Sequence, residues 1–324
     1  MSTTDSTQVP KVCLVNFADG KFTVGQERLK RTLADIGYEG GTLFANELPA
    51  GCPDHTESPW GFKPFLMEQA ADLGYDILIW VDAAIMARAS LEPLIQRILE
   101  KQIFFFSRGI SSMGAWTSDY ALEELGFTRE EAFKIRDVIT IVIGIDIRSP
   151  KGKVFLNEWK LAAMHKKVLL GVDKPLTLTD SYWNTYGQLS NDPRVKGHRH
   201  DQPLLSMLAH VLHIKPNDDL VFDIKSEAKG GNKYSKHIPL NTVLVENRDF
   251  KISPTDMMND FSAYKTSYAS IIFTLVRKTK DLIRSTILYF VRKPETAVML
   301  MSPKRILYRL KNKPTFDDIK SRPV

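Results

Sequence analysis

The sequence has little cysteine and no pattern of metal-binding residues. Cys13 and Cys52 are its only two cysteines in 324 residues. Cys13 lies in an apolar run, as a buried thiol would, and Cys52 lies in a Gly-Cys-Pro loop. Neither fits the short Cys and His spacings of a zinc site. The sequence therefore argues against a structural metal cluster and is typical of a protein in a reducing compartment.

Long apolar runs are also missing. A membrane-spanning helix needs about 18 or more consecutive apolar residues, and the best candidate, 268–276, is far shorter. The first nine residues are polar and lack the apolar segment of a secretory signal. We therefore expect a disordered N-terminus over 1–10 and a protein of the cytoplasm.

Several familiar catalytic motifs do not occur. There is no G-x-x-x-x-G-K-S/T, no G-x-G-x-x-G after the first expected strand, no H-E-x-x-H and no G-x-S-x-G. These motifs carry phosphate, dinucleotide, zinc and acyl-transfer chemistry. Their absence argues against P-loop NTPases, the usual dinucleotide enzymes, zincins and α/β-hydrolases.

What is present is an ordinary globular composition, 43% hydrophobic and 25% charged, in which apolar runs alternate with helical spacings. This alternation predicts an α/β fold with a mostly parallel, doubly wound sheet. Gly37 is expected to follow the end of the first helix, and Thr128 with Glu131 forms a capping box. Strands are expected at 11–18, 41–45, 76–81, 103–106, 138–147, 221–224 and 243–245, and helices at 24–36, 63–73, 91–101, 151–164, 181–189 and 202–213.

The composition changes after about residue 250, where Lys and Arg become frequent and Gly becomes rare. We expect one α/β domain over 11–250 and a basic amphipathic helical tail over 251–324. The basic excess indicates an anionic partner. The tail either lies in an anionic membrane surface or packs on the α/β domain with its lysines in solvent. No nucleic-acid-binding motif accompanies the charge, so no nucleic-acid partner is expected.

The strand expected at 76–81 ends at Asp82. Ligands of open α/β sheets bind beyond the carboxyl ends of the strands, and a carboxylate placed there can hold a divalent cation or a sugar hydroxyl. The alternative is that Asp82 only ends the strand and bonds backbone amides in the turn.

Five consecutive polar residues, from His198 to Gln202, precede an expected helix. Helix N-termini favour anions because their backbone N–H groups are free. Asp201 would suffice as the N-cap, and that is its structural alternative. The neighbouring His198, Arg199, His200 and Gln202 exceed what capping needs, which favours a functional segment.

An aromatic segment with a lysine, Trp60-Gly-Phe-Lys-Pro64, precedes the helix expected at 63–73. Its rings and Lys63 suit a sugar or a phosphate. The alternative is a hydrophobic staple made by Trp60 and Phe62.

A second aromatic segment spans 180–186. Its Trp183 and Asn184 suit the C–H face and the hydroxyls of a carbohydrate. Tyr182 and Tyr186 instead have the helical spacing that is typical of core residues.

The order of these segments over about 11–216 resembles GT-A glycosyltransferases of the bacterial or viral glycan-synthesis type. Such enzymes open with a β-α-β unit that holds the nucleotide, and later have a strand that ends in an Asp-x-Asp motif. Asp82-Ala-Ala84 stands at the motif's place, 142–146 resembles a later strand of small residues, and 198–202 resembles a late Asp-Gln segment.

The resemblance implies transfer of a hexose or related sugar from a nucleotide-sugar donor to a glycan or lipid-linked acceptor, as in polysaccharide biosynthesis. In an inverting enzyme Asp201 or His200 would be the general base, and in a retaining enzyme Asp201 would bind the sugar. Donor contacts are expected from Asn16, Phe17, Ala18, Asp19, Lys63, Asp82 and Ala84, and acceptor contacts from Trp183, Asn184, His198, Arg199 and Gln202.

The resemblance also concerns a metal. In metal-dependent relatives two acids bracket Mn²⁺ or Mg²⁺ on the diphosphate, but here Ala84 takes the place of the second acid. The metal site at Asp82 is then weaker, completed elsewhere or absent, in which case Lys63, Arg88 or Arg199 would neutralise the phosphates. Ala84 also leaves open a non-catalytic module that binds a nucleotide sugar or glycan and scaffolds at a membrane.

Overall fold

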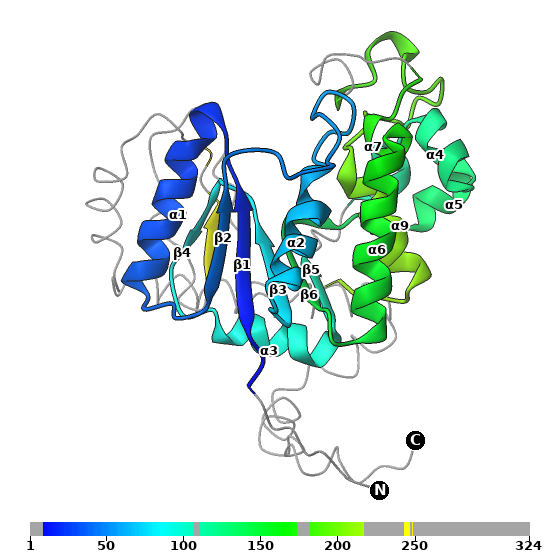
Figure 1. The fold of residues 1–324 in the computed structure, drawn as a ribbon. Helices are drawn as coiled ribbons and strands as arrows, with labels where there is room; N and C mark the ends of the chain where they lie inside the picture. The colour runs from blue at the N-terminus through cyan, green and yellow to red at the C-terminus, as the bar shows by residue number, and fades with distance from the viewer. Residues whose placement is uncertain (1–8, 107–110, 174–181, 217–242, 247, 249–324) are drawn as a thin grey trace, which may run out of the picture. The chain divides into compact units, whose positions relative to one another are not determined.

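A computed structural model describes residues 9–106, 111–173, 182–216, 243–246 and 248 (Figure 1). All of them belong to one compact unit, Met1–Lys265. Within these described ranges, no helix is both long enough and apolar enough to cross a membrane. The strand expected at 221–224 and the tail expected at 251–324 lie outside the described residues.

The centre of the fold is a five-stranded sheet in the order β2-β1-β3-β6-β5. Strand β1 (Val12–Phe17) pairs in parallel with β2 (Gly41–Ala45) and with β3 (Ile77–Val81). Strand β6 (Ile139–Asp146) runs antiparallel to β3 and to β5 (Ile103–Phe106). Four of the five strands therefore share one direction, and the prediction of a mostly parallel sheet is confirmed.

Helices cover both faces of this sheet, as a doubly wound fold requires (Figure 1). Helices α1 (Thr23–Asp35) and α3 (Glu92–Lys101) pack on one face. There Leu29, Leu94 and Ile98 form one buried cluster with every second residue of the strands. Gly144 is needed at this contact because a Cβ atom there would lie 2.4 Å from the Ile98 side chain.

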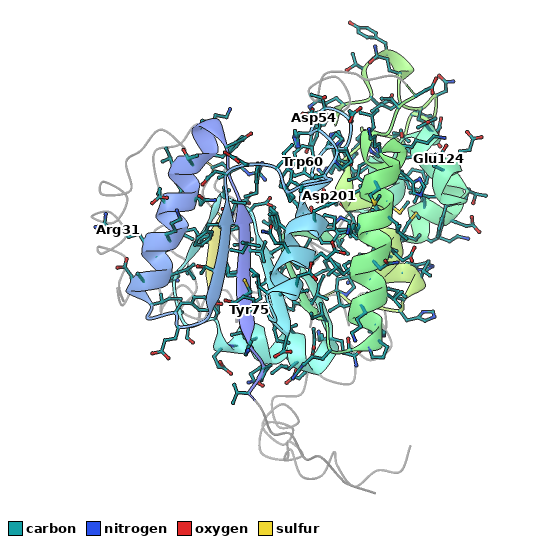
Figure 2. The ribbon with its side chains drawn as sticks, viewed as in Figure 1. Arg31, Asp54, Trp60, Tyr75, Glu124 and Asp201 are labelled. Atoms are coloured by element: carbon teal, nitrogen blue, oxygen red, sulfur yellow. The ribbon has the colours of Figure 1, made fainter. Side chains whose placement is uncertain are left out.

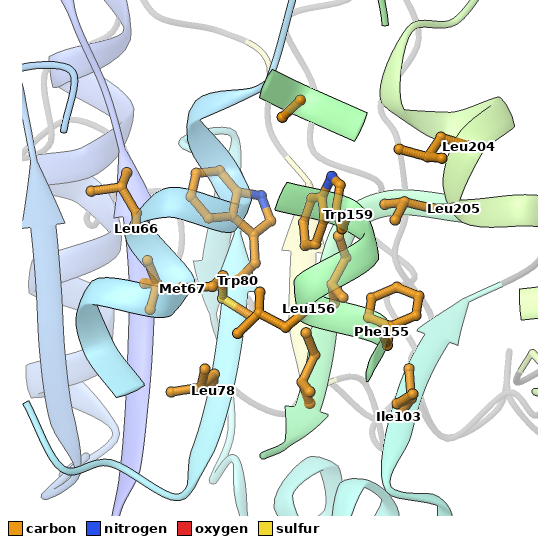
Figure 3. Close-up of a cluster of buried hydrophobic side chains, with 14 of the residues drawn as sticks. Leu66, Met67, Leu78, Trp80, Ile103, Phe155, Leu156, Trp159, Leu204 and Leu205 are labelled. Carbon is orange, nitrogen blue, oxygen red and sulfur yellow. The ribbon is translucent and has the colours of Figure 1, made fainter. Parts of the chain in front are cut away.

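Helices α2 (Phe62–Asp72) and α6 (Pro150–His165) pack on the other face. Figure 3 shows the core that they form, with Trp80 of β3 and Trp159 of α6 both fully buried. At about 25 cal/mol for each Å² of apolar surface removed from water, such large rings contribute strongly to the stability of the fold.

Shorter elements surround the carboxyl edge of the sheet. Helix α9 (Asp201–Val211) packs beside α6 and α7 (Lys167–Leu170), and α4 (Asp119–Leu125) and α5 (Arg129–Lys134) lie next to it (Figure 1). The 3₁₀ turns are Gly20–Phe22, Met113–Trp116 and Thr185–Gly187, and a two-stranded ribbon joins β4 (Ile85–Ala87) to β7 (Leu244–Glu246).

Two local predictions are confirmed and one is wrong. Gly37 has φ +67° directly after α1, and Thr128 with Glu131 forms the expected capping box. The helix expected at 181–189 does not extend over 183–189, where the described chain makes a 3₁₀ turn at Thr185–Gly187 and Tyr186 is 97% exposed. Asn184 holds this loop through its side-chain amide, which bonds the backbone of residues 189 and 190.

Candidate functional site

A cavity of about 540 Å³ lies beyond the carboxyl end of β3. Because β6 runs antiparallel to β3, its first residues reach the same edge of the sheet, and Val81 faces Val142. The backbone N–H of Asp82 continues this pairing by donating to the carbonyl of Ile141. Helices α2 and α9 begin at the same place. Trp60 and Asp201, which line the cavity, are labelled in Figure 2 above the sheet.

Lys63 of α2 is held between two carboxylates at the wall of this cavity. Its Nζ lies 2.8 Å from Asp201 Oδ2 and 3.4 Å from Asp82 Oδ1, and it donates to the Thr140 carbonyl at 3.1 Å. Its side chain is only 1% exposed. Burial lowers the pKa of this ammonium, but the two carboxylates outweigh burial and raise it, so Lys63 stays charged.

The direction of the Asp82 carboxylate is set by its own strand. Trp80 Nε1 donates to Asp82 Oδ1 at 2.7 Å, and the side chain of Asp82 remains 26% exposed toward the cavity. The backbone carbonyl of Asp82 accepts the N–H of Ile85 and so closes the turn after β3. The carboxylate bonds the Trp80 ring instead, so the bond in the turn comes from the backbone of Asp82 and not from its side chain.

The sequence left open that Asp201 is only the N-cap of its helix, and this alternative is wrong. The residue before α9 is His200, and Asp201 is the first residue of the helix, so it is not the N-cap. Its carboxylate lines the cavity and accepts from Lys63 and, at 3.3 Å, from the Thr140 hydroxyl. Burial raises the pKa of Asp201, and the charge of Lys63 offsets part of that rise. A carboxylate with these partners suits proton transfer or sugar binding better than capping.

His200 stacks on Trp60, with 4.8 Å between the ring centroids. Its Nδ1 lies 2.9 Å from the Leu169 carbonyl, which only accepts, so Nδ1 carries the proton. Burial lowers the pKa of His200 to about 4 and keeps the ring neutral at pH 7. The remaining nitrogen, Nε2, is buried and has no hydrogen-bond partner among the described residues. As the unprotonated nitrogen, Nε2 is an acceptor, and it belongs to a residue that lines the cavity.

Both rings are presented by strained backbone. His200 has φ +53° and Trp60 has φ +59°, a region that bulky side chains rarely adopt. Such strain costs of the order of 1–3 kcal/mol for each residue and gathers at functional sites.

A second charged group lines the cavity around Arg199. Its guanidinium lies 3.5 Å from the centroid of the Trp116 ring and 3.6 Å from Asp137. Gln202 donates to Asp137 Oδ1 at 2.7 Å and holds that carboxylate in place. The Nε of Arg199 is buried without a hydrogen-bond partner in the described part of the chain. The group therefore offers a guanidinium donor to an anionic ligand.

Asp137 was not among the residues predicted from the sequence. It lies just before the N-terminal end of β6. In a parallel sheet ligands bind beyond the carboxyl ends of the strands, so an N-terminal residue would lie at the opposite edge. Only the antiparallel direction of β6 brings it to the cavity. The signal that could have found it is its position as an acidic residue directly before a buried apolar run.

Six of the predicted site residues meet at this cavity, and eight do not line it. Those that meet are Lys63, Asp82, Arg199, His200, Asp201 and Gln202. The other eight form two groups. One group lies at the end of β1 and in the loop after it, together with Ala84, and the other lies near α9.

In the loop after β1 the predicted donor residues have other partners. The Asn16 amide donates to the Val81 carbonyl at 2.7 Å and accepts from Gln26, which ties β1 to β3 and α1. Phe17 packs on Phe62, with 4.5 Å between ring centroids. Ala18 and Ala84 are buried, and Asp19 is exposed beside the Gly20–Phe22 turn.

Near α9, His198 is completely buried below the cavity and contacts the Leu169 carbonyl at 3.3 Å through Nε2. Asn184 holds its loop. Trp183 is 53% exposed, and its ring lies 5.7 Å from Trp116 and 4.9 Å from Tyr182. Since Trp116 and Tyr182 line the cavity, Trp183 continues the same aromatic wall outward.

The residues around Asp82 do not fit a resident divalent cation. The carboxylate already accepts from Trp80 and faces the ammonium of Lys63, which a metal would have to displace. Ala84 contributes no donor. Throughout the described ranges, no group of three or more His, Cys, Asp or Glu side chains is placed to hold a metal ion.

Known proteins resemble this chain in solved structures but not in sequence families. No family model and no curated protein match the sequence. Solved structures of glycosyltransferases do resemble the chain. A glycosyltransferase involved in glycosylation of the major capsid of PBCV-1 shares 13% identity over 55% of this chain and 71% of that chain, with a TM-score of 0.31.

Two further structures extend this resemblance. The galactosyltransferase LgtC, with donor and acceptor sugar analogues, shares 12% identity over 49% of this chain and 69% of that chain, with a TM-score of 0.28. Mouse xyloside xylosyltransferase 1 shares 10% identity over 65% and 86%, with a TM-score of 0.36. At these TM-scores and identities, the chemistry has to be argued from this chain's own cavity.

Proposed function

We propose that the protein transfers a sugar from a nucleotide-sugar donor to a hydroxyl of a glycan or lipid-linked acceptor. The observation that carries this proposal is the cavity at the carboxyl end of β3. There an aromatic wall meets the buried carboxylate of Asp201, the partly exposed carboxylate of Asp82, an imidazole nitrogen without a partner among the described residues and a guanidinium. Ligand sites of open α/β sheets lie at this edge, and pockets with apolar walls and a few fixed polar groups bind small molecules.

The donor's diphosphate would lie near Arg199. A guanidinium presents paired donors that match phosphate oxygens, and the Nε–H of Arg199 has no partner within the described residues. Lys196 and Arg248 line the same cavity and add positive charge. Lys63 is less suited to this role because its ammonium already faces three oxygens.

The reaction itself would be a displacement at the anomeric carbon. The acceptor oxygen forms the new bond, the bond to the phosphate oxygen breaks, and the nucleoside diphosphate leaves with the electron pair. In an inverting transfer Asp201 would take the hydroxyl proton, since burial raises its pKa toward the working range of a general base. His200 Nε2 would orient that hydroxyl as an acceptor. In a retaining transfer Asp201 would instead bind the donor sugar.

The acceptor would follow the aromatic wall. Trp116 and Tyr182 line the cavity, and the exposed Trp183 extends their surface into solvent. Sugar C–H faces pack on such rings, while the ring edges and polar tips remain available for hydrogen bonds. A glycan chain would then enter from the side of Trp183.

The experiment that tests this function is a thermal-shift panel of UDP, GDP, CMP and their common sugars, followed by NMR detection of donor hydrolysis or transfer. Stabilisation by one nucleotide class, lost in Arg199→Gln and kept in Arg148→Gln, supports the proposal. Arg148 is a matched control because it forms its ion pair with Asp146 at the other end of β6. No response to any nucleotide contradicts the proposal.

Binding without catalysis is a second candidate, favoured by one observation. Both carboxylates that would serve chemistry, Asp82 and Asp201, are already engaged by Lys63. A module of this kind would bind a nucleotide sugar or glycan and scaffold at a membrane. Hydrolysis of the donor without any acceptor would rule it out.

We propose further that the tail over 251–324 attaches the protein to an anionic membrane surface from the cytoplasmic side. Only the sequence supports this, since the tail lies outside the described residues. Basic and apolar residues alternate there in the pattern of an interfacial helix. Flotation with anionic liposomes tests it: replacing Arg277, Lys278 and Lys280 by Gln should reduce binding, whereas replacing Lys151 and Lys153 of α6 should not.

A further inference from the structure

The ammonium of Lys63 is surrounded by oxygens in the manner of a bound cation. Asp201 Oδ2, the Thr140 carbonyl and Asp82 Oδ1 lie 2.8, 3.1 and 3.4 Å from Nζ. Carboxylate and carbonyl oxygens are also the donors that hard divalent cations prefer. The ammonium donates hydrogen bonds to the Asp201 carboxylate and the Thr140 carbonyl and forms an ion pair with Asp82.

The position of Lys63 is not explained by its helix. Lys63 is the second residue of α2, and a cation in the first turn is disfavoured because a helix N-terminus already carries partial positive charge. Its side chain is also among the largest that the fold buries completely. Burying an ammonium is costly unless it is paired and hydrogen-bonded. The two carboxylates therefore hold Lys63 where it is.

We propose that Lys63 occupies the cation position of the paired carboxylates Asp82 and Asp201, so that this site works without a divalent metal. The structure assigns the charge balance of the carboxylates to a side chain that is always present. The negative charge of a diphosphate then falls to Arg199, Lys196 and Arg248, which line the same cavity. This last consequence rests on the proposed function, whereas the role of Lys63 toward the two carboxylates does not.

The wild-type chain gives the first test. Its melting temperature should not change with millimolar Mn²⁺ or Mg²⁺ alone, and any nucleotide-induced shift should be the same in EDTA. An increase with Mn²⁺ alone that Asp82→Asn removes would overturn the proposal. So would a nucleotide response that disappears in EDTA.

The second test creates the metal site. Lys63→Ala leaves both carboxylates without their cation, so Mn²⁺ alone should now raise its melting temperature, by about 2–4 °C for each kcal/mol of binding. The gain should vanish in Lys63→Ala with Asp82→Asn. Lys166→Ala is the matched control, because its exposed ion pair with Glu57 lies outside the cavity lining, and it should gain nothing.

Lys63→Met keeps more of the buried volume and serves if Lys63→Ala does not fold. A folded Lys63 variant that gains no response to Mn²⁺ would contradict the proposal. The metal measurements use Mn²⁺ without nucleotide, so they can fail or succeed whether or not the protein binds a nucleotide sugar. Failure of the proposed function would show instead as no response of the wild type to any nucleotide.

Discussion

The ring of His200 lies 4.8 Å from the ring of Trp60, and both residues hold a positive φ just before or near the start of a helix. Each ring supports the other across the junction of α2 and α9. The contact leaves His200 Nε2 as an acceptor without a partner among the described residues. The imidazole is thereby oriented before any ligand arrives.

His200→Phe tests this orientation. A phenyl ring keeps the stacking on Trp60 but removes Nε2 and the hydrogen bond from Nδ1 to the Leu169 carbonyl. The Leu169 carbonyl keeps its contact with His198 Nε2 at 3.3 Å, so the loss of one hydrogen bond should cost about 0.5–1.5 kcal/mol of stability. The loss of Nε2 should lower kcat/KM for sugar transfer by about 10–100-fold, as one lost hydrogen bond does. Urea unfolding and steady-state kinetics measure the two effects separately. Unchanged kinetics would remove His200 from the site.

The two buried histidines make stability depend on pH. Burial lowers the pKa of His198 to about 3 and that of His200 to about 4, from 6.5 in the unfolded chain. Below pH 6.5 the unfolded chain therefore binds protons that the folded chain does not. The free energy of unfolding should therefore decrease as the pH is lowered, by up to about 1.4 kcal/mol per pH unit for each imidazole. The decrease ends once the pH drops below the pKa values of the folded state.

Unfolding free energies measured between pH 7 and pH 4 check this slope. His198→Gln should reduce it, because one of the two imidazoles is gone. His165→Gln is the control, since His165 is exposed at the end of α6. Burial raises the pKa of Asp137 and Asp201, so these carboxyls act in the opposite direction. The comparison of variant and wild type is therefore decisive: an equal slope in both would show that His198 is not held neutral.

Gly171→Ala should lower the free energy of unfolding more than the replacement of a typical glycine with positive φ does. Gly171 has φ +75°, and a Cβ atom there would lie 2.2 Å from the His198 ring. Gly37 has φ +67° with nothing within 4 Å of the same atom. Gly37→Ala should therefore cost only the backbone strain, about 1–2 kcal/mol, and Gly171→Ala should cost an additional 1–3 kcal/mol, roughly the cost of overpacking. Equal losses in chemical denaturation would mean that His198 moves aside freely.

Asp137→Asn should weaken ligand binding through Arg199. The amide oxygen can still accept from Gln202, but the charge that faces the guanidinium at 3.6 Å is lost. Among the described residues, the contact with Trp116 would then remain to hold the Arg199 guanidinium. A diphosphate should therefore bind less tightly, although the cavity gains a positive charge. Calorimetric titration with nucleotide measures the affinity, and tighter binding would show that Asp137 competes with the ligand for Arg199.

The sequence determined much of the local structure. Strands at 76–81 and 103–106 could be placed because residues buried on both faces are apolar without interruption, and α1 and α3 because their apolar residues recur every three or four positions. The segment from Arg199 to Gln202 could be chosen because it carries more polar groups than a helix start needs. Each of these signals depends only on residues close in the chain.

Tertiary structure decided what the cavity contains. The apolar pattern of β6 is the same in either direction, so only its antiparallel pairing with β3 brings Asp137 and Thr140 to the carboxyl edge. Lys63 and Asp201 are 138 residues apart, and nothing in either segment reveals that they pair. Periodicity records which side chains are buried, whereas charge pairing depends on which segments the fold places opposite one another. That is why Asp201 was foreseen as a cap or a catalytic group, and why its ion pair with Lys63 emerged only from the fold.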